Sequence, residues 1–462
     1  MILSLEEINK KNIDFDYCII GSGPAGMTVA IELAKQNANV LIVEAGDFKY
    51  SKRSQEIYDG KVIGDPYFEL SNARVRQFGG SSNHWAGWCR ALDDIDFKNW
   101  PIKKKDLDIY YDQALKILEL PIIPDDKILD KEAGIKEFTF KWSSPPVNFG
   151  KKYYEKIKKS SNLYLTLNAN VLKLNSESNI INSIDVINYD NFKAKIKANK
   201  FILATGGIEN SRLLLWSNMN SNNKTVVKDD KTLGKYWMEH HVFTIGDVVS
   251  TDDFKRVTFY SLTAKKQEQL KILNCGLRLH NNTPSGAKKV VTDLMCNAPK
   301  LGKLLLGDNL ICEKTLRAAW EQEPLEENCI KLSTEEKDYL GTPKVELYWK
   351  KSEFDIKTVR ETAMQFGQYL INTNKGRLKL HDWVYGAGES PKNDELAGYH
   401  HMGGTRMGTK PSNSIVDSNC KVWGQENLYI AGSSVFPYAG HTNPTFTIVQ
   451  LSLRLAQHLM KA

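Results

Sequence analysis

A glycine-rich segment near the start of this chain has residue types and spacing suited to binding phosphate. Residues 21–26 read Gly-Ser-Gly-Pro-Ala-Gly, and Glu44 follows the last of these glycines by 18 positions. The glycines permit a tight turn, a close approach of the backbone to a pyrophosphate, and close packing of a helix on a strand. Amide groups at the start of that helix attract phosphate, and an acid placed like Glu44 hydrogen-bonds ribose hydroxyls. The pattern predicts a dinucleotide site, NAD or FAD, made by Gly21, Ser22, Gly23, Pro24, Ala25, Gly26 and Glu44.

A second loop of this kind would be needed by a flavin reductase or monooxygenase that binds NAD(P)H in the same manner. The other glycine-rich candidate, residues 386–391, lacks the third glycine and has no apolar strand before it. The sequence therefore disfavours an NADPH-driven monooxygenase with two nucleotide loops.

Histidines and cysteines give no sign of a metal site. The nine histidines show no His-x-x-x-His pair or His/carboxylate cluster of ligand spacing, and the seven cysteines include no Cys-x-x-Cys pair. Neither a metal nor a disulfide framework is predicted, and a reducing compartment fits. The N-terminus lacks a basic segment followed by a long apolar run, so we expect a cytoplasmic protein that starts near Met1.

The overall composition is that of a globular protein. Hydrophobic residues make up 41% and charged residues 25% of the 462 residues. The apolar stretches have the length of strands, far below the ~18 residues of a membrane span, so no span is expected. The net charge of +7 comes from 62 basic and 55 acidic residues dispersed along the chain. Without a recognition motif or interleaved aromatic residues, this charge predicts a solvated surface rather than a nucleic-acid partner.

Apolar segments toward both ends of the chain predict the elements that must position the glycine loop. They alternate between strand-like and helix-like periodicity, as β-α-β units do. The expected elements are strands at 16–20, 40–43, 201–204 and 427–431, and helices at 25–36, 209–217 and 447–459.

The middle of the chain has a different character. Residues 345–349 alternate between apolar and polar side chains, and residues 355–372 indicate a helix, within a stretch from about 242 to 396. This predicts an antiparallel substrate-binding domain inserted into a nucleotide domain that is assembled from both ends of the chain. The expected boundaries are 1–100, 155–240 and 396–462 for the nucleotide domain, and 101–154 and 241–395 for the substrate domain.

Five segments together resemble the glucose-methanol-choline (GMC) oxidoreductases, flavoenzymes that oxidise alcohols and sugars, in the bacterial sugar-dehydrogenase and pyranose-oxidase-like branch. The resemblance covers both ends of the chain and weakens in the middle. It implies an α/β fold, with a doubly wound FAD-binding domain and an inserted antiparallel sheet, and it favours FAD over NAD. The segments, in the order the family has them, are residues 21–26, 79–87 (GGSSNHWAG), 204–215, 401–408 (HMGGTRMG) and 440–445 (GHTNPT).

The resemblance also implies which residues lie against the flavin. In pyranose-oxidase-like members the histidine matching His84 carries a covalent bond to FAD, whereas related members with a similar His-Trp pair have none, so both states stay open. Trp85 and Trp88 are interpreted as packing residues. Besides the glycine loop, the implied cofactor-binding residues are Ala45, Gly79, Gly80, Ser81, Asn83, His84, Trp85, Ala86, Gly87, Val171, Ala204, Thr205, Gly206, Gly432, Ser433, Asn443, Pro444 and Thr445.

Two residues match the family's catalytic pair. His401 matches the base, and a neutral imidazole can accept a hydroxyl proton near pH 7. Asn443 matches its partner and would orient the substrate oxygen. His400 lies one step out of register, and His441 lies two residues before Asn443, where it could touch substrate. The adjacent pair at 240 and 241 is interpreted as structural.

The resulting prediction is an FAD-dependent enzyme that oxidises a CH-OH group of a sugar, aminosugar or polyol-like alcohol to a carbonyl. Hydride would pass to flavin N5 as His401 takes the hydroxyl proton, and oxygen or another acceptor would then take the electrons. Two alternatives from other classes stay open: an NAD-linked alcohol dehydrogenase, and a protein that binds FAD without turnover.

Overall fold

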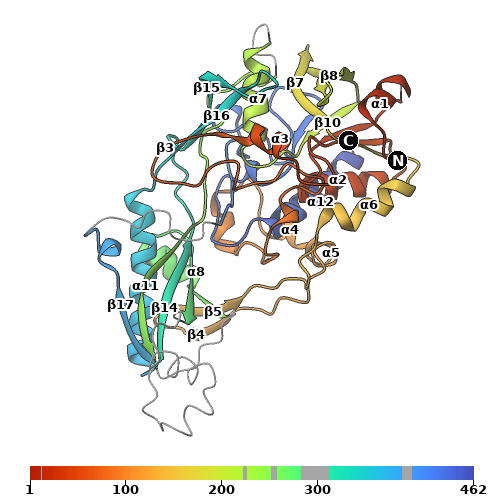
Figure 1. Cartoon of the computed structure of the whole chain (residues 1–462). Coiled ribbons are helices and arrows are strands. Elements are labelled where there is room, and N and C mark those ends of the chain that lie inside the picture. The colour runs from red at the N-terminus through yellow and green to blue at the C-terminus, as the bar shows by residue number, and fades with distance from the viewer. Residues whose placement is uncertain (12, 222–225, 251–257, 282–311, 388–397, 462) are drawn as a thin grey trace.

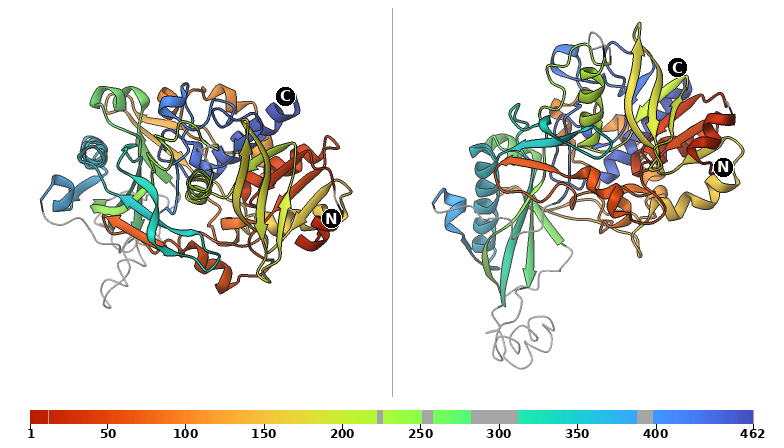
Figure 2. Two further views of the ribbon diagram at one scale, coloured as in Figure 1. Left: turned by 90° about the horizontal axis from the view of Figure 1, so that it is seen from above. Right: turned by 45° about the horizontal axis from the view of Figure 1, so that its top comes forward.

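The computed structural model describes residues 1–11, 13–221, 226–250, 258–281, 312–387 and 398–461. These residues form a half built around a parallel sheet and a half built around an antiparallel sheet, which lie side by side (Figures 1 and 2). Part of the second glycine-rich segment, residues 388–391, and parts of the expected middle domain lie outside the described residues.

The parallel sheet has five strands in the order β18-β10-β1-β2-β6, and every neighbouring pair is parallel. Its strands are short apolar runs that are almost wholly buried, as expected for a sheet covered on both faces. Because β2 and β10 lie on opposite sides of β1, the loops that leave their carboxyl ends diverge there and leave room for a ligand. The strands are β1 (Tyr17–Ile20), β2 (Val40–Val43), β6 (Leu163–Thr166), β10 (Lys200–Leu203) and β18 (Leu428–Ile430).

Helices and a small sheet cover this parallel sheet (Figure 1). The first long helix, α2, packs against the closing helix α12. The helix starts with Pro24, whose missing N–H and fixed φ suit the first helical position. The covering elements are α1 (Leu5–Lys11), α2 (Pro24–Ala34), α6 (Phe149–Lys159), α7 (Glu209–Met219), α12 (Thr445–Lys461), β7 (Asn170–Glu177), β8 (Ile180–Ile187) and β9 (Lys193–Ile196).

The antiparallel sheet has seven strands in the order β17-β11-β14-β13-β12-β5-β4. One of its faces is covered by the helix α11 (Glu353–Asn372), whose buried side chains include Val359, Phe366 and Leu370. A capping box formed by Ser352 and Asp355 fixes the start of this helix. The strands are β4 (Lys127–Asp130), β5 (Ile135–Thr139), β11 (His241–Ser250), β12 (Thr258–Leu262), β13 (Cys275–Asn281), β14 (Cys312–Trp320) and β17 (Gly376–Leu380).

Another three-stranded sheet joins segments that are far apart in the sequence. Its strand β3 (Gly60–Gly64) runs parallel to β16 (Pro343–Trp349), which pairs antiparallel with β15 (Cys329–Lys337). The described chain also contains short α-helices: α3 (Lys52–Gln55), α4 (Lys105–Asp108), α5 (Tyr111–Ile117) and α8 (Ala264–Leu270).

The predicted α/β fold class is confirmed: a parallel sheet is assembled from both ends of the chain, and an antiparallel sheet lies between them in sequence. The predicted elements differ from the observed ones by at most two residues at either end. The closing helix begins at Thr445 rather than 447, and the first long helix ends at Ala34 rather than 36. Among the described helices, none has the length and apolar character needed to cross a bilayer.

Candidate active site

The glycine loop lies at the carboxyl end of β1 and is shaped by backbone contacts. Gly21 has φ 103°, and a Cβ there would meet the carbonyl oxygen of Ala204 at 2.5 Å. A Cβ on Gly26 would lie 2.1 Å from the Gly21 carbonyl oxygen. Gly23 is different, because a Cβ there would meet no atom within 4 Å. Two glycines are thus required by the fold, and the middle one faces open space.

Glu44 holds this loop in its folded shape. Its Oε2 accepts hydrogen bonds from the backbone N–H of Ser22 at 3.0 Å and from the Ser22 hydroxyl at 2.6 Å, and its Oε1 accepts from Gly46 at 2.7 Å. The Ser22 hydroxyl oxygen also accepts the N–H of Gly79 at 3.0 Å. The two sequence blocks predicted to bind the cofactor are therefore joined directly.

The block at 79–87 is a braced turn. A Cβ on Gly80 would lie 2.9 Å from the Cα of Gly23, so the two loops are in contact. The Asn83 side chain donates to the carbonyls of Phe78 at 3.0 Å and Gly80 at 2.8 Å, which closes the turn. The Trp85 indole donates to the Val147 carbonyl at 2.8 Å and packs against the core, as interpreted from the sequence. Exposed side chains of the block are Ser81, His84 and Ala86, and Gly87 packs against Pro146.

Loops after β10 and β18 complete the same edge of the sheet. The Thr205 N–H and hydroxyl both donate to the Asn210 side-chain oxygen, at 3.0 and 2.7 Å. Gly206 has φ 97° and, like Gly23, would place a Cβ in open space. The nearest atom to a Cβ on Gly432 would be the Ala25 side chain at 3.8 Å. Small residues from separate loops thus line an open cradle of the type that a dinucleotide needs, and the residues present fit FAD.

Four of the predicted cofactor residues lie further along this edge or beside it. The Ala45 carbonyl accepts the Tyr189 hydroxyl at 2.9 Å. Val171 is in β7, where it pairs with Val186. Pro444 and Thr445 lead into and begin α12, whose amino end follows Asn443.

His401 is a buried side chain, 7% exposed, held by the loops after β10 and β18. The Ser433 hydroxyl donates to its carbonyl oxygen at 2.6 Å, and a Cβ on Gly207 would lie 2.3 Å from that same oxygen. Burial, aided by the charge of Arg74, lowers the pKa of His401 to about 3. The imidazole is therefore neutral near pH 7 and has one lone pair that can accept a proton.

Tyr67 and Glu239 form a polar group behind this imidazole. The Tyr67 hydroxyl lies 3.1 Å from His401 Nε2 and donates to Glu239 Oε2, which is 4.0 Å from the same ring nitrogen. The other carboxylate oxygen, Oε1, accepts the backbone N–H groups of His240 and His400, at 2.8 and 2.6 Å. Burial raises the pKa of Glu239 to about 7. Tyr67 comes from the loop after β3, so three distant segments meet here.

His240 joins the loop of His401 to the loop of Asn443. Its Nε2 lies 2.7 Å from the Gly440 carbonyl oxygen, and its Nδ1 lies 2.9 Å from His400 Nδ1. A carbonyl can only accept, so Nε2 carries the hydrogen. Burial lowers the pKa of His240 well below its usual range, so Nδ1 carries none and accepts from His400. His240 and His400 are therefore held in place by hydrogen bonds between loops. This supports the interpretation of His240 as a structural residue.

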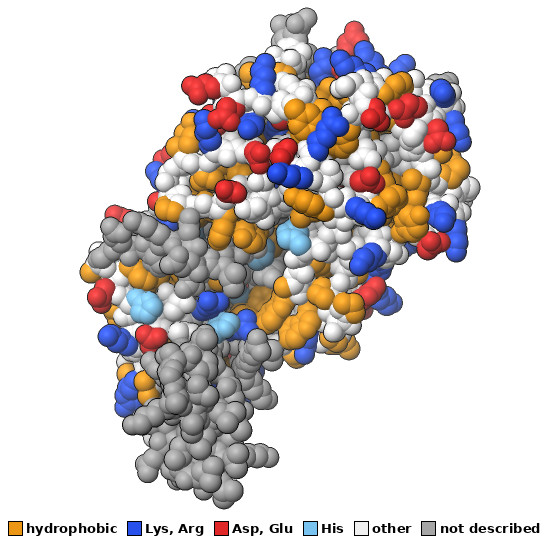
Figure 3. Space-filling view, in the orientation of Figure 1, with side chains coloured by type: hydrophobic (Ala, Val, Ile, Leu, Met, Phe, Trp, Pro, Cys, Tyr) orange, Lys and Arg blue, Asp and Glu red, His pale blue; other side chains and the backbone are white. Residues whose placement is uncertain are grey.

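Asn443 is placed next to the antiparallel sheet. Its side-chain N–H group donates to the Trp88 carbonyl at 3.0 Å, which fixes the orientation of the amide and leaves its oxygen as an acceptor. Trp88 stacks on Trp142 with 4.7 Å between ring centroids, and Arg278 lies over its ring at 4.8 Å. Figure 3 shows hydrophobic side chains and histidines gathered where the two halves meet.

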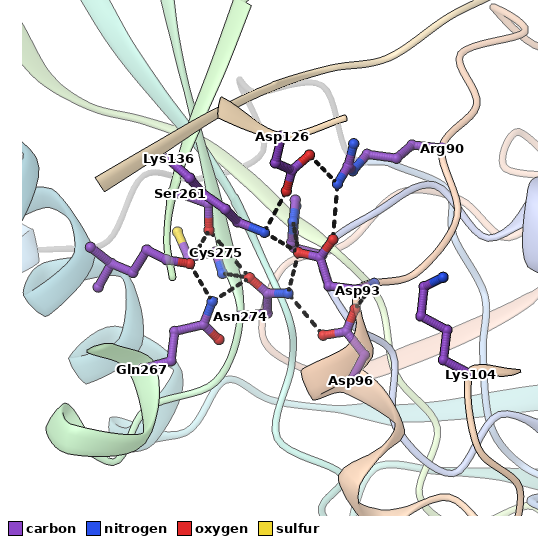
Figure 4. Close-up of polar contacts among 12 residues, drawn as sticks. Arg90, Asp93, Asp96, Lys104, Asp126, Lys136, Ser261, Gln267, Asn274 and Cys275 are labelled. Atoms are coloured by element: carbon purple, nitrogen blue, oxygen red, sulfur yellow. Dashed lines mark hydrogen bonds and ion pairs between the residues drawn. The ribbon is translucent and has the colours of Figure 1, made fainter. Parts of the chain in front are cut away.

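A buried charged network lies beside this loop at the junction of the two halves (Figure 4). Asp93 pairs with Arg90 at 3.0 Å and with Lys136 of β5 at 2.7 Å, and Asp126 pairs with the same two cations. The Nε2 of His441 lies 3.7 Å from Asp93. Burial alone would raise the pKa of Asp93, but His441 and the two cations hold it well below its usual range. His441 thus faces this network, and its side chain is buried.

Two family models match the chain. The model of the GMC oxidoreductases matches residues 324–452, which include His401 and Asn443, and the model of the FAD dependent oxidoreductases matches residues 16–119, which include the glycine loop. The chain belongs to the GMC oxidoreductase family. It is accordingly an FAD-dependent enzyme that acts on CH-OH donors.

Individual GMC relatives are distant. The 2-methyl-1,2-propanediol dehydrogenase of Mycolicibacterium austroafricanum is 21% identical, over 96% of this chain and 95% of the relative. The fructose dehydrogenase large subunit of Gluconobacter japonicus is 26% identical, over 61% of this chain and 51% of the relative. Among solved structures, pyridoxine 4-oxidase from Mesorbium loti superposes with a TM-score of 0.66 at 15% identity, covering 97% of this chain and all of that one. This last similarity shows the fold.

Sequence reasoning missed part of this site. Tyr67 lies in a loop that matches none of the five blocks, so nothing in the sequence pointed to it. Glu239 precedes the two adjacent histidines and could have been noticed, because an acid in a segment that is otherwise apolar, such as Tyr-Trp-Met-Glu, must find partners when buried.

Proposed function

We propose that this GMC oxidoreductase oxidises a secondary or primary alcohol of a sugar, aminosugar or polyol-like molecule to a carbonyl, with His401 as the base. The observation that carries the proposal is the position of His401. Its neutral imidazole is buried, and its backbone is fixed by the loops after β10 and β18, at the edge of the sheet that presents the open glycine cradle.

FAD, when bound in this cradle, supplies a two-electron acceptor for a hydride. The residues of the chain do the remaining work. A ring nitrogen of His401 takes the hydroxyl proton of the alcohol while the carbon gives up its hydride. Because the imidazole starts neutral, it can accept this proton at neutral pH without first losing one. Burial keeps water away from the ring, so the proton comes from the substrate.

Asn443 is proposed to position the substrate oxygen. Its N–H group is committed to the Trp88 carbonyl at 3.0 Å, so the amide is held rigidly with respect to the antiparallel sheet. The amide oxygen and the second N–H remain to bind a hydroxyl group. A held amide of this kind contributes orientation rather than proton transfer.

The names of the relatives support the substrate class. They include a dehydrogenase of a small diol, a fructose dehydrogenase subunit, and C-glycoside 3-oxidases that are 27% and 39% identical over 34% and 14% of this chain. Each name refers to the oxidation of a molecule that carries hydroxyl groups. We propose a polyhydroxylated substrate for this chain on that basis, with either oxygen or another molecule as the electron acceptor.

An anaerobic screen tests the proposal. Sugars, aminosugars and polyols are mixed with the flavin-loaded protein, and bleaching of the flavin absorption is followed before air is admitted. We expect at least one such alcohol to bleach the flavin. His401→Asn should retain bound FAD and slow bleaching by roughly 10²- to 10⁴-fold. Bleaching at an unchanged rate in this variant would contradict the assignment of the base.

A further inference from the structure

Tyr67 joins two groups that both need its single hydroxyl hydrogen. It can donate that hydrogen to Glu239 Oε2 or to His401 Nε2, but not to both at once. If the hydrogen goes to an ionised Glu239, the Tyr67 oxygen accepts from His401, so Nε2 carries a hydrogen and the lone pair lies on Nδ1. If Glu239 is protonated, the carboxyl group donates to Tyr67, Tyr67 donates to Nε2, and the hydrogen of the neutral ring lies on Nδ1.

We propose that Glu239, acting through Tyr67, sets the tautomer of His401 and thereby decides whether this imidazole can act as the base. Glu239 and Tyr67 are positioning residues in this scheme, since only His401 touches the reacting hydroxyl group. The inference rests on the proposed function for its catalytic consequence. The tautomer itself is a property of the chain alone.

The ionised state of Glu239 is the competent one. Nε2 is occupied by Tyr67 in either state, so the alcohol proton must be accepted at Nδ1, and Nδ1 has a lone pair only when Nε2–H donates to Tyr67. The O–H proton of the alcohol then forms an N–H bond at Nδ1, and the electron pair of the broken C–H bond leaves with the hydride. The resulting imidazolium faces the carboxylate charge through the Tyr67 hydroxyl, at 4.0 Å from Nε2 to Oε2.

This arrangement answers a difficulty in the site. With Glu239 neutral, burial lowers the pKa of His401 to about 3, which makes the ring a weak proton acceptor. A carboxylate at that distance in a buried site stabilises the imidazolium and strengthens the base. The remaining contacts of Glu239 come from backbone amides of two segments, which hold Oε1 and leave Oε2 facing Tyr67.

Several titratable groups face Glu239 from the elements packed around it. Because none of them changes its charge near pH 7, a pH step there is assigned to Glu239 itself. Burial lowers the pKa of His400 to about 4, and that of its partner His240 lies well below the usual range, so both stay neutral between about pH 5 and about pH 9. Burial raises the pKa of Tyr67 and of Tyr399, so neither phenol ionises there. The groups concerned are Tyr67 from the loop after β3, Tyr399, His400 and His401 from the catalytic loop, and His240 from its own segment. The charge of Arg74 acts on Tyr67 and His401.

The sign of the expected pH dependence follows from the raised pKa of Glu239, about 7. Below that pH the carboxyl group is protonated and His401 holds the wrong tautomer, so the rate of flavin reduction by a saturating alcohol should be low. It should rise with pH and level off above about 7. Two pH units below the step the rate should be about 100-fold lower, since 1% of the carboxyl groups are ionised there.

Glu239→Gln is the first test. A glutamine can accept the two backbone N–H groups with its oxygen and donate to Tyr67 with its nitrogen, so it imitates the protonated acid at every pH. We expect a slow rate with no pH step. Tyr67→Phe removes the hydroxyl group and should also abolish the step, although Glu239 still titrates. A step that persists in either variant, or a wild-type rate that falls with pH, would overturn the proposal.

Glu321→Gln is the matched control. Glu321 is another buried carboxyl group whose pKa is raised to about 7 by burial, and it lies beside the backbone of Gly440 rather than beside Tyr67. Its replacement should preserve the pH step. If the step disappears in Glu321→Gln and persists in Glu239→Gln, the titrating group is Glu321 and the inference is refuted.

A measurement without substrate separates this inference from the proposed function. In protein labelled with ¹⁵N-histidine, nitrogen chemical shifts distinguish a protonated ring nitrogen from one with a lone pair, and His401→Asn identifies the signals. We expect hydrogen on Nε2 above about pH 7 and on Nδ1 below it, and hydrogen on Nδ1 throughout in Glu239→Gln. If the same ring nitrogen carries the hydrogen at every pH and in Glu239→Gln, the inference is refuted, even if alcohols bleach the flavin. If no alcohol bleaches it but the tautomer switches, only the proposed function fails.

Discussion

The edge of the parallel sheet and the face of the antiparallel sheet place their chemical groups by different means. At the edge, backbone contacts decide the residue type, because a Cβ on Gly21 or Gly26 would overlap a carbonyl oxygen. On the antiparallel sheet, side chains pack against one another, as Phe259 does between Phe138 and Arg278. A backbone contact admits one residue type, whereas a packed surface admits many of similar shape. The two halves should therefore respond differently to substitution.

A substitution at the junction between the halves should have the largest effect on stability. The groups there are held by a network of ion pairs rather than by backbone contacts or side-chain packing. Lys136→Met removes the Nζ that lies 2.7 Å from Asp93 and 2.9 Å from Asp126, and it leaves the buried Asp93 and the partly exposed Asp126 to share Arg90. Loss of one partner from a buried network costs about 3–5 kcal/mol. We expect this decrease in the free energy of unfolding, measured by urea denaturation.

The same substitution at the surface is the control. Lys61 pairs with Glu336 at 2.6 Å, but the two side chains are 51% and 40% exposed. Lys61→Met should therefore leave the free energy of unfolding almost unchanged, because solvent screens an exposed ion pair. Equal costs at the two positions would show that the junction network is solvated and does not hold the halves together.

Gly26→Ala should have the next largest effect. The added Cβ would lie 2.1 Å from the Gly21 carbonyl oxygen and 3.0 Å from the Ala204 side chain, so strand and helix must separate. We expect a loss of about 1–3 kcal/mol of stability together with loss of FAD binding, measured by thermal unfolding and by flavin titration.

Gly23→Ala separates folding from cofactor binding. No atom of the protein lies within 4 Å of a Cβ at this position, so the stability of the FAD-free protein should change by less than about 0.5 kcal/mol. The methyl group would occupy space proposed for the pyrophosphate, so FAD affinity should still fall. Unchanged affinity would place the cofactor elsewhere along this edge.

The difference between backbone contacts and side-chain packing also explains what the sequence could predict. The α/β class and the glycine loop followed from residue types that the backbone requires, and apolar runs marked the buried parallel strands. Strand order could not be predicted, because β18 and β6 join the sheet from segments whose apolar runs do not encode their neighbours. The ends of helices moved by a few residues, because capping depends on local geometry that periodicity does not report.

The candidate site was predictable only in part, for a related reason. His401 and Asn443 lie in blocks with a recognisable pattern, but the structure shows their separate contacts, to Tyr67 and to the Trp88 carbonyl. The group formed by Tyr67 and Glu239 joins residues that are 172 positions apart. No local pattern records a pairing over that distance, so it emerges only when β3, β16 and β15 bring the segments together.

Trp88→Phe should have the smallest effect on FAD binding, because it changes the packed surface rather than a backbone contact at the glycine edge. Phenylalanine keeps an aromatic ring that can stack on Trp142 and lie under Arg278, and the Trp88 carbonyl that holds Asn443 is unchanged. Phenylalanine is smaller than tryptophan, but Trp88 is only half-buried, so solvent and neighbouring side chains can fill the space that the indole leaves. We therefore expect kcat/KM for an accepted alcohol to fall less than about 10-fold, with FAD affinity unchanged. A loss as large as that of Gly26→Ala would show that the antiparallel face, like the glycine edge, requires one residue type, and the distinction between the halves would fail.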